Sequence, residues 1–336
     1  MLTIKESLGQ GICKADIANF WPQAQGRVRD VLGAFYEEPV PAGFYPHFNE
    51  VALRMTLLRA VPELKALQEQ VHAMLKSDFC AIVIDRLHLA AVEQPLRNGL
   101  LYAMCTAIGF ATPSSQQQAT LLWDVKARPV PSGRDATYSE HSNEADLHTD
   151  SQSYPVPEDW FALYVHQAAR CGGGASVFLG VQALRASLGT TAAGREALKT
   201  LSTHGFPFFV SAGEGTAPGA GTVTVAPILG ERPAIRFRRD VLEKGFQARP
   251  DLDTPAARAA VVALSTAIEN HPARVTCQLP DDGMALCDNH RLLHGRTAFQ
   301  DAGRHLVRVR MSPQPVAVHV VQMLKDNVGF AKALLS

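Results

Sequence analysis

The triplet His148-Thr149-Asp150 is the part of this sequence whose residue types point most directly to chemistry. If the triplet is extended, its first and third side chains point to the same face, so one imidazole and one carboxylate can bind a single cation. A third ligand is then needed, and His294, in the downstream segment 288–296, is the natural candidate. Because the two histidines lie far apart in the chain, only the fold can bring them together.

Two imidazoles and one carboxylate on one side of a metal ion leave the opposite positions open. Non-haem Fe(II) oxygenases use this ligand set to bind a cosubstrate and dioxygen. An H-x-D triplet alone is weak evidence, since most histidines near acids bind no metal. The segment 304–310, Arg-His-Leu-Val-Arg-Val-Arg, follows His294 and strengthens the interpretation.

Arginines in that segment offer a fixed cation for the far carboxylate of a keto diacid, because guanidinium presents a planar fork that matches a carboxylate. Period-two alternation puts Arg308 and Arg310 on one face and Val307 and Val309 on the other. Both arginines therefore compete for the inward position, and Arg304 is a further candidate to share it. The competing interpretation is a solvated basic edge strand, and it is favoured for Arg310.

The composition predicts a compact protein that acts on a small molecule. Lys plus Arg and Asp plus Glu both total 32, so no net charge favours nucleic acid or a membrane surface. Hydrophobic residues make up 46% and charged residues 19% of the 336 residues, enough for a sizeable core. The N-terminus lacks a signal-peptide pattern, and the six cysteines form no C-x-x-C pair. We expect a cytoplasmic protein, with a homo-oligomer left open.

Hydrophobic spacing predicts helices first and short strands afterwards. Helices are predicted over 15–35, 50–75 (kinked or split at Pro62) and 96–108, with helical insertions over 181–200 and 255–269. Strands are predicted over 79–84, 120–126, 161–166, 176–179, 222–226, 274–278, 283–287 and 306–311. This pattern favours a mixed β fold with peripheral α: a double-stranded β-helix, or jelly roll.

We expect a single domain over 1–336. It comprises a helical N-terminal portion (1–78), a jelly-roll core with insertions (79–313) and a C-terminal extension (314–336).

Four motifs, in this order, resemble a known family. They are the H-T-D triplet, Gly-Gly-Ala-Ser at 173–176, Asp-Asn-x-x-x-x-His-Gly-Arg at 288–296, and Gly-Arg-His-Leu-x-Arg at 303–308. Together they resemble the Fe(II)/2-oxoglutarate dioxygenases of the taurine dioxygenase (TauD/TfdA) and clavaminate synthase-like group. The resemblance covers roughly 79–313, and the joint occurrence of the motifs is more specific than any one of them.

The resemblance implies that His148, Asp150 and His294 bind Fe(II) and that Arg308 binds the distal carboxylate of the cosubstrate 2-oxoglutarate. Ser176 stands where the family usually carries a cosubstrate-binding Thr. The implied reaction uses O2 to hydroxylate, desaturate or cyclise at an unactivated C–H bond, with release of succinate and CO2. Because halogenating relatives replace the carboxylate ligand by Gly or Ala, retention of Asp150 disfavours halogenation.

The expected substrate is a small polar metabolite, an amino acid or a derivative of one, and the expected setting is secondary metabolism. The polar segment 138–146 leads into the triplet, and Asn143 and Glu144 are its candidates for binding an amine or guanidinium. The alternative is a solvated loop. Arg296 either meets a substrate carboxylate or pairs with a nearby acid.

Two other functions use the same ligands. A cupin-like hydrolase or isomerase would hold zinc or manganese and has no use for Arg308. A sensor would bind 2-oxoglutarate or a metal without turnover. Consumption of dioxygen with release of succinate separates the enzyme from the sensor.

Overall fold

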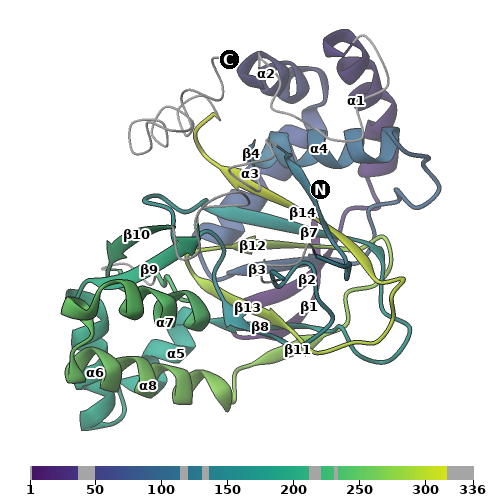
Figure 1. Cartoon of the computed structure of the whole chain (residues 1–336). Coiled ribbons are helices and arrows are strands. Elements are labelled where there is room, and N and C mark those ends of the chain that lie inside the picture. Colours follow the sequence, from purple (N-terminus) through teal and green to yellow (C-terminus); the bar gives the residue numbers. More distant parts are fainter. Residues whose placement is uncertain are drawn as a thin grey trace.

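Two β-sheets form the centre of the molecule (Figure 1). The computed structural model describes residues 2–36, 50–113, 120–130, 136–211, 221–230 and 234–315. The eight-stranded sheet has the order β1 (Thr3–Gly9), β2 (Ile12–Asp16), β3 (Ala81–Ile84), β12 (Met284–Asp288), β7 (Trp160–Gln167), β14 (His305–Ser312) and β4 (Phe110–Thr112), with β5 (Leu122–Val125) also paired to β14. The four-stranded sheet has the order β11 (Val275–Cys277), β8 (Ser176–Gly180), β13 (Leu292–Arg296) and β6 (Ala145–His148).

Alternation along the strands gives each sheet an inner and an outer face. Side chains from both sheets meet in one buried cluster, which includes Phe161, Phe178, Leu292 and Leu306. Their neighbours in sequence face outward, as Val307 does. The inner faces thus enclose a shared interior, which confirms the predicted jelly roll.

Helices cover the outer face of the large sheet. These are α1 (Trp21–Phe35), α2 (Glu50–Ala60), α3 (Pro62–Lys76) and α4 (Leu96–Ile108). Their apolar sides pack against outward residues of β14, namely Val307, Val309 and Met311. The break that Pro62 predicted is present: α2 ends at Ala60, and Pro62 is the first residue of α3.

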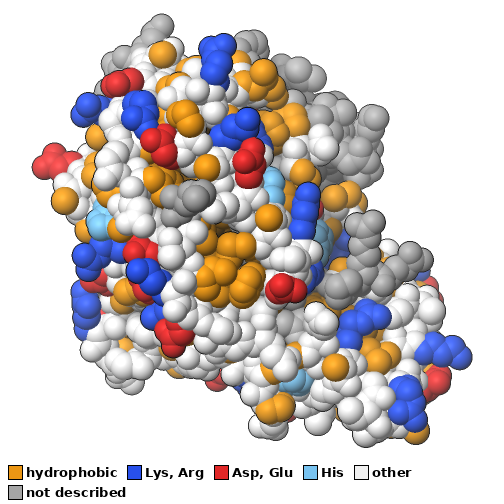
Figure 2. Space-filling model, turned by 180° about the vertical axis from the view of Figure 1, so that it is seen from behind, with side chains coloured by type: hydrophobic (Ala, Val, Ile, Leu, Met, Phe, Trp, Pro, Cys, Tyr) orange, Lys and Arg blue, Asp and Glu red, His pale blue; other side chains and the backbone are white. Residues whose placement is uncertain are grey.

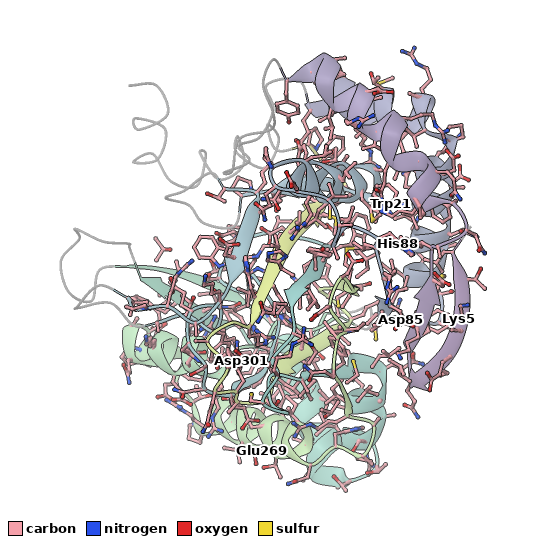
Figure 3. The ribbon with its side chains drawn as sticks, turned by 90° about the vertical axis from the view of Figure 1, so that its right-hand side faces the viewer. Lys5, Trp21, Asp85, His88, Glu269 and Asp301 are labelled. Atoms are coloured by element: carbon pink, nitrogen blue, oxygen red, sulfur yellow. The ribbon has the colours of Figure 1, made fainter. Side chains whose placement is uncertain are left out.

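A helical insertion covers the outer face of the small sheet. It comprises α5 (Val181–Leu188), α6 (Ala192–Thr203), the hairpin β9 (Phe206–Ser211) and β10 (Gly221–Ala226), α7 (Arg239–Ala248), a 3-10 turn η1 (Pro250–Leu252) and α8 (Pro255–Glu269). Thr191 and Thr254 begin α6 and α8 by accepting a hydrogen bond from a backbone N–H. In Figure 3, Trp21 of the N-terminal layer and Glu269 of this insertion lie on opposite sides of the sheets.

Two parts of the sequence-based prediction were wrong or incomplete. The first sixteen residues are not helical, because β1 and β2 form a hairpin, with β2 parallel to β3. β1 is mostly exposed and polar, so it carries little apolar pattern to read. The strands β4, β6, β9 and β13 and the helix α7 were also not predicted. Most of the expected C-terminal extension, from residue 316 onward, lies outside the described residues.

The surface carries mixed charge. On the face shown in Figure 2, Lys and Arg side chains are interspersed with Asp and Glu, as the equal numbers of the two signs predict. Within the described residues, every helix is too short or too polar to pass through a lipid bilayer.

Candidate metal centre

His148 and His294 are cross-strand neighbours in the small sheet. β6 and β13 are antiparallel, and their register places the two residues directly opposite each other. The outward position before each is apolar, Leu147 on β6 and Leu293 on β13, so both imidazoles point into the interior. The ring centroids are 4.3 Å apart, and Phe161 of the large sheet packs at 4.3 Å from the ring of His294.

Asp150 lies just beyond the end of β6, in a turn that Asn289 holds in place. Its backbone N–H donates to Oδ1 of Asn289 at 2.8 Å, and Nδ2 of Asn289 donates to the carbonyl of Asp150 at 3.1 Å. The same Nδ2 donates to the carbonyl of Glu158 at 2.9 Å. Asn289 is 1% exposed, so these bonds form away from water. The turn between β12 and β13 thereby fixes the third ligand.

The donor atoms fit a divalent cation. Nδ1 of His148 donates to the carbonyl of Asp146 at 2.7 Å, which leaves Nε2 as the acceptor. Nδ1 of His294 is buried and has no hydrogen-bond partner among the described residues. One ligand atom from each of His148, Asp150 and His294 lies within 4.8 Å of the other two. Two nitrogens and one carboxylate oxygen suit Fe(II) and leave coordination positions for other ligands.

The electrostatics keep each ligand in its cation-binding state. Burial lowers the pKa of His148 well below its usual range and that of His294 to about 4, so both imidazoles are neutral at pH 7. Burial alone would raise the pKa of Asp150. The guanidiniums of Arg308 and Arg310 outweigh it and hold that pKa well below its usual range, so the carboxylate is ionised.

Arg308 and Arg310 both point into the interior. Nη1 of Arg308 lies 3.1 Å from Asp150, and Nε of Arg310 lies 3.3 Å from Oδ2 of the same carboxylate. The edge-strand interpretation favoured for Arg310 is wrong, because β14 lies between β7 on one side and β4 and β5 on the other. Arg310 is 8% exposed. Two cations thus reach one carboxylate, and Nε of Arg308 has no partner in the described part of the chain.

Ser176 and Arg304 lie together at the other end of β14. Ser176 is buried on β8, directly opposite Arg296 of β13. It lines a small cavity with Arg304 and Leu306. The guanidinium of Arg304 is buried over the ring of Phe299 and donates weakly, at 3.4 Å, to the carbonyl of Gly174. Burial lowers the pKa of Arg304 to about 10, with a smaller effect from Arg296.

The three tentative substrate residues lie away from the metal ligands. The guanidinium of Arg296 donates to the carbonyls of Tyr138, His141 and Asn143, so it holds the segment that precedes β6. Asn143 and Glu144 are exposed. Glu144 lines a hollow on the outer face of β6, which also includes Leu147, Arg239 and Arg274. The structure therefore does not bring these side chains to the triad.

Sequence reasoning missed four residues around the triad. Asn289 stood in a quoted motif but was given no role. Tyr138 packs edge-on against the ring of His148 at 4.8 Å, and Arg238 lies over the ring of Tyr138 at 4.3 Å. Glu158 is buried near both inward arginines. Asn289 had a signal in its place in the motif, and Tyr138 in its place at the start of the polar segment 138–146; Arg238 and Glu158 come from segments with no recognisable spacing.

Comparison with known proteins gives one family match and several solved structures of similar fold. The pattern of the family described as "Taurine catabolism dioxygenase TauD, TfdA family" matches residues 61–310. No curated protein matches the chain. A solved asparagine oxygenase in complex with Fe(II), 2S,3S-3-hydroxyasparagine and succinate is 18% identical, with a TM-score of 0.64 over 89% of this chain and 93% of that one.

A second solved structure is the non-heme iron oxygenase OrfP in complex with Fe, succinate and (3S)-hydroxy-L-Arg. It is 18% identical, with a TM-score of 0.60 over 90% of this chain and 94% of that one. OrfP in complex with Fe and alpha-ketoglutaric acid gives the same TM-score of 0.60 at 17% identity, over the same shares of 90% and 94%. At such identities the likeness establishes a shared fold.

Proposed function

The chain belongs to the taurine catabolism dioxygenase TauD, TfdA family, and from that premise we propose that it hydroxylates a free amino acid or a close derivative of one. As a member of this family it is an Fe(II)- and 2-oxoglutarate-dependent oxygenase. It consumes O2 and 2-oxoglutarate and releases succinate and CO2. Desaturation and cyclisation at the same C–H bond are the alternative outcomes.

The convergence of three ligand side chains beside two buried arginines is the observation that carries this proposal. His148, Asp150 and His294 hold the iron, which together with 2-oxoglutarate activates dioxygen for oxidation of a C–H bond when both are bound. We assign Arg308 to the distal carboxylate of 2-oxoglutarate, because its guanidinium is inward and only partly satisfied. We assign the hydroxyl of Ser176, on the opposite sheet, to the binding of 2-oxoglutarate as well.

The proposed substrate class rests on two supports. Proteins of the same fold have been solved with hydroxylated asparagine and with hydroxylated arginine. The interior beside the triad also carries both signs of charge, on Arg310 and Glu158. Of the residues first considered for substrate binding, Asn143 and Glu144, which precede the triplet, and Arg296, which follows His294, keep that role only as predictions from their place in the sequence.

The buried arginine pair argues against a hydrolase. A cupin-like hydrolase or isomerase needs the metal but gains nothing from the desolvated guanidinium of Arg308 aimed at its carboxylate ligand. A sensor of 2-oxoglutarate would need Arg308 as the oxygenase does, and consumption of dioxygen with release of succinate separates these two functions. A homo-oligomer, a cytoplasmic location and a place in secondary metabolism stay predictions from sequence.

An anaerobic spectroscopic experiment tests the proposal. Fe(II) and 2-oxoglutarate added to the apoprotein should produce a visible charge-transfer band, and air together with a suitable amino acid should bleach it while succinate appears. Arg308→Gln should raise the cosubstrate concentration needed for half-maximal band intensity by about 10- to 100-fold, since a charge-assisted bidentate contact is lost.

Arg308→Lys is the matched variant, because it retains charge without the planar fork and should give an intermediate effect. Absence of the band in the wild-type protein would refute the assignment of the cosubstrate site. Retention of full affinity in Arg308→Gln would move the carboxylate-binding role to Arg310 or Arg304.

A further inference from the structure

Glu158 is a buried carboxylate that the iron chemistry does not use. It precedes β7, is 3% exposed, and accepts a hydrogen bond from the hydroxyl of Thr112 at 3.3 Å through Oε1. Thr112 is the cross-strand neighbour of Arg310 in the pairing of β4 with β14. The carboxylate of Glu158 therefore lies at the end of β14 that carries Arg310 toward Asp150.

The second oxygen of this carboxylate is left without a partner. Oε2 of Glu158 is buried, and no hydrogen bond reaches it from the residues that the structure describes. A buried carboxylate oxygen without a donor is costly, and native proteins rarely keep one unless a ligand or water supplies the donor. The contact with Asn289 does not need the carboxylate, because Asn289 binds the backbone carbonyl of Glu158 rather than its side chain.

Tyr154 and Arg310 complete the polar group. Burial raises the pKa of Tyr154, and a hydrogen bond from Arg310 opposes that shift. Burial alone would lower the pKa of Arg310, but the charges of Asp150 and Glu158 outweigh it and raise that pKa, so the guanidinium is charged. A cation and an anion are thus buried side by side next to the metal ligands.

The charges of the loaded site change the partners of this pair. In the protein alone, the charges of Asp150 and Glu158 balance those of Arg308 and Arg310. Fe(II) and dianionic 2-oxoglutarate bring charges that cancel each other. When Asp150 binds the iron and Arg308 binds the cosubstrate, the carboxylate of Asp150 neutralises Arg310 less fully, because the iron draws on the same negative charge. Arg310 and Glu158 are then one buried cation and one buried anion beside the metal ligands, and a ligand with a group of each sign would compensate both.

We propose that Glu158 and Arg310 are the substrate-recognition pair of this enzyme, Glu158 binding an ammonium group and Arg310 a carboxylate of one zwitterionic substrate. The inference rests on the proposed function and narrows it, since it requires both groups on the same molecule. A primary amine without a carboxylate leaves Arg310 uncompensated. A hydroxy or keto acid without an ammonium group leaves Glu158 uncompensated.

Ligand binding to the anaerobic Fe(II)/2-oxoglutarate complex tests the charge requirement without turnover. The probes are the twenty common L-amino acids, scored by the shift of the charge-transfer band. For the amino acid with the tightest binding, the matched amine (carboxylate removed) and the matched α-hydroxy acid (ammonium removed) are then compared. Each matched compound should bind at least about 10-fold more weakly, because one charge-assisted contact is lost.

Two isosteric variants assign the contacts. Glu158→Gln should raise the KM for the amino acid by about 10- to 100-fold and leave the KM for the cosubstrate unchanged, because the ammonium loses its charged acceptor. Glu158→Gln should also bind the amino acid and the α-hydroxy acid with more nearly equal affinity than the wild type does. Arg310→Gln should instead bind the amino acid and the amine with more nearly equal affinity. Glu196→Gln, on the exposed side of α6, is the control and should match the wild type.

The outcomes separate this inference from the proposed function. If the wild-type protein forms no charge-transfer band, the proposed function fails and the pairing fails with it. If the band forms but none of the twenty amino acids shifts it, the pairing is overturned together with the proposed substrate class, while the cosubstrate site stands. If the matched amine or hydroxy acid binds as well as the amino acid, only the pairing is overturned. The same holds if Glu158→Gln binds the amino acid with wild-type affinity while remaining folded by circular dichroism.

Discussion

Asp150 is the residue on which the charges of the site converge. Its carboxylate meets two guanidiniums, its backbone is held by Asn289, and the imidazoles of His148 and His294 lie beside it. The neutral state of those imidazoles is the property of the site most directly open to measurement, because it makes the stability of the metal-free protein depend on pH.

The apoprotein should lose stability as the pH falls from about 6.5 toward 4. Burial lowers the pKa of His294 in the folded protein to about 4, whereas an unfolded chain protonates near 6.5. Within this window the unfolded state binds more protons, so acid favours unfolding, by roughly 1.4 kcal/mol per pH unit for one histidine. Urea unfolding at several pH values, in the presence of a chelator, measures the slope.

His294→Gln removes this titration and serves as the comparison. Its free energy of unfolding should fall less steeply between these pH values than that of the wild type. Above about pH 7.5, His294 is neutral in the folded and the unfolded chain alike, so the difference between the two proteins should stay constant there. Equal slopes throughout the acid range would contradict a neutral, buried His294.

At the residue scale, the sequence predicted the three side chains that the fold brings together as a candidate metal site, but little of what surrounds them. His148, Asp150 and His294 could be named because few residue types bind iron and their spacing suits strands. Glu158 and Tyr154 could not, because the importance of Glu158 arises from its burial beside Arg310 and that of Tyr154 from its hydrogen bond with Arg310. Their segment has no periodicity that distinguishes an interior acid from one on a surface loop.

Among the elements, the pairing of β6 with β13 sets the distance between the two imidazoles. Gly295 follows His294 and lies against the backbone of β6, where an added Cβ would be 2.6 Å from the carbonyl of Ala145. Such an approach is closer than van der Waals contact, and a backbone carbonyl has little freedom to move away. This glycine therefore permits the close pairing that brings the histidines together.

Gly295→Ala should weaken iron binding although the residue is no ligand. The added methyl group pushes β6 away from β13 and displaces His148, so we expect an affinity for Fe(II) lower by about 10- to 100-fold, as for other changes that misplace a ligand. Anaerobic titration monitored by the charge-transfer band measures it. Gly26→Ala on α1, where an added Cβ meets nothing within 4 Å, is the control. Wild-type affinity in Gly295→Ala would show that β6 adjusts freely.

The predictability of elements followed the strength of their apolar pattern. The helix α8 and the strand β14 were predicted almost to the residue, because their apolar positions are regular. The short strand β6, with the sequence Ala-Asp-Leu-His, carries too few apolar residues to be recognised. It forms because Leu147 packs on the insertion and β13 supplies its hydrogen-bonding partner. Both causes are tertiary and lie outside any local window.

On the scale of the whole molecule, two outer apolar layers enclose the sheets. One joins the N-terminal helices to β14, and the other joins the insertion to β6, β8 and β13. Because the strands share the interior cluster between these layers, we propose that residues 1–336 unfold as a single domain, as the sequence analysis expected.

Leu57→Ala in α2 and Leu264→Ala in α8 test this domain proposal from opposite sides. Both leucines are fully buried, so each change should cost about 2–5 kcal/mol of unfolding free energy. In a single cooperative unit, each variant should shift the whole calorimetric transition to lower temperature. Val262→Ala, an exposed position of α8, is the control. A transition that splits in two in either variant would show that the layers unfold independently.

Both faces of β14 are buried, and this restricts which insertions and substitutions homologues can carry in the strand. One face presents Arg308 and Arg310 to the interior, while the other anchors Val307, Val309 and Met311 among the N-terminal helices. Inserting a single residue between Val307 and Arg308 would exchange the inward and outward positions of the rest of β14. The two guanidiniums would then face the apolar N-terminal helices, and Val309 would face the interior between the sheets. Homologues should therefore tolerate length changes in the turn at 298–303, and along the strand itself only replacements of one side chain by another.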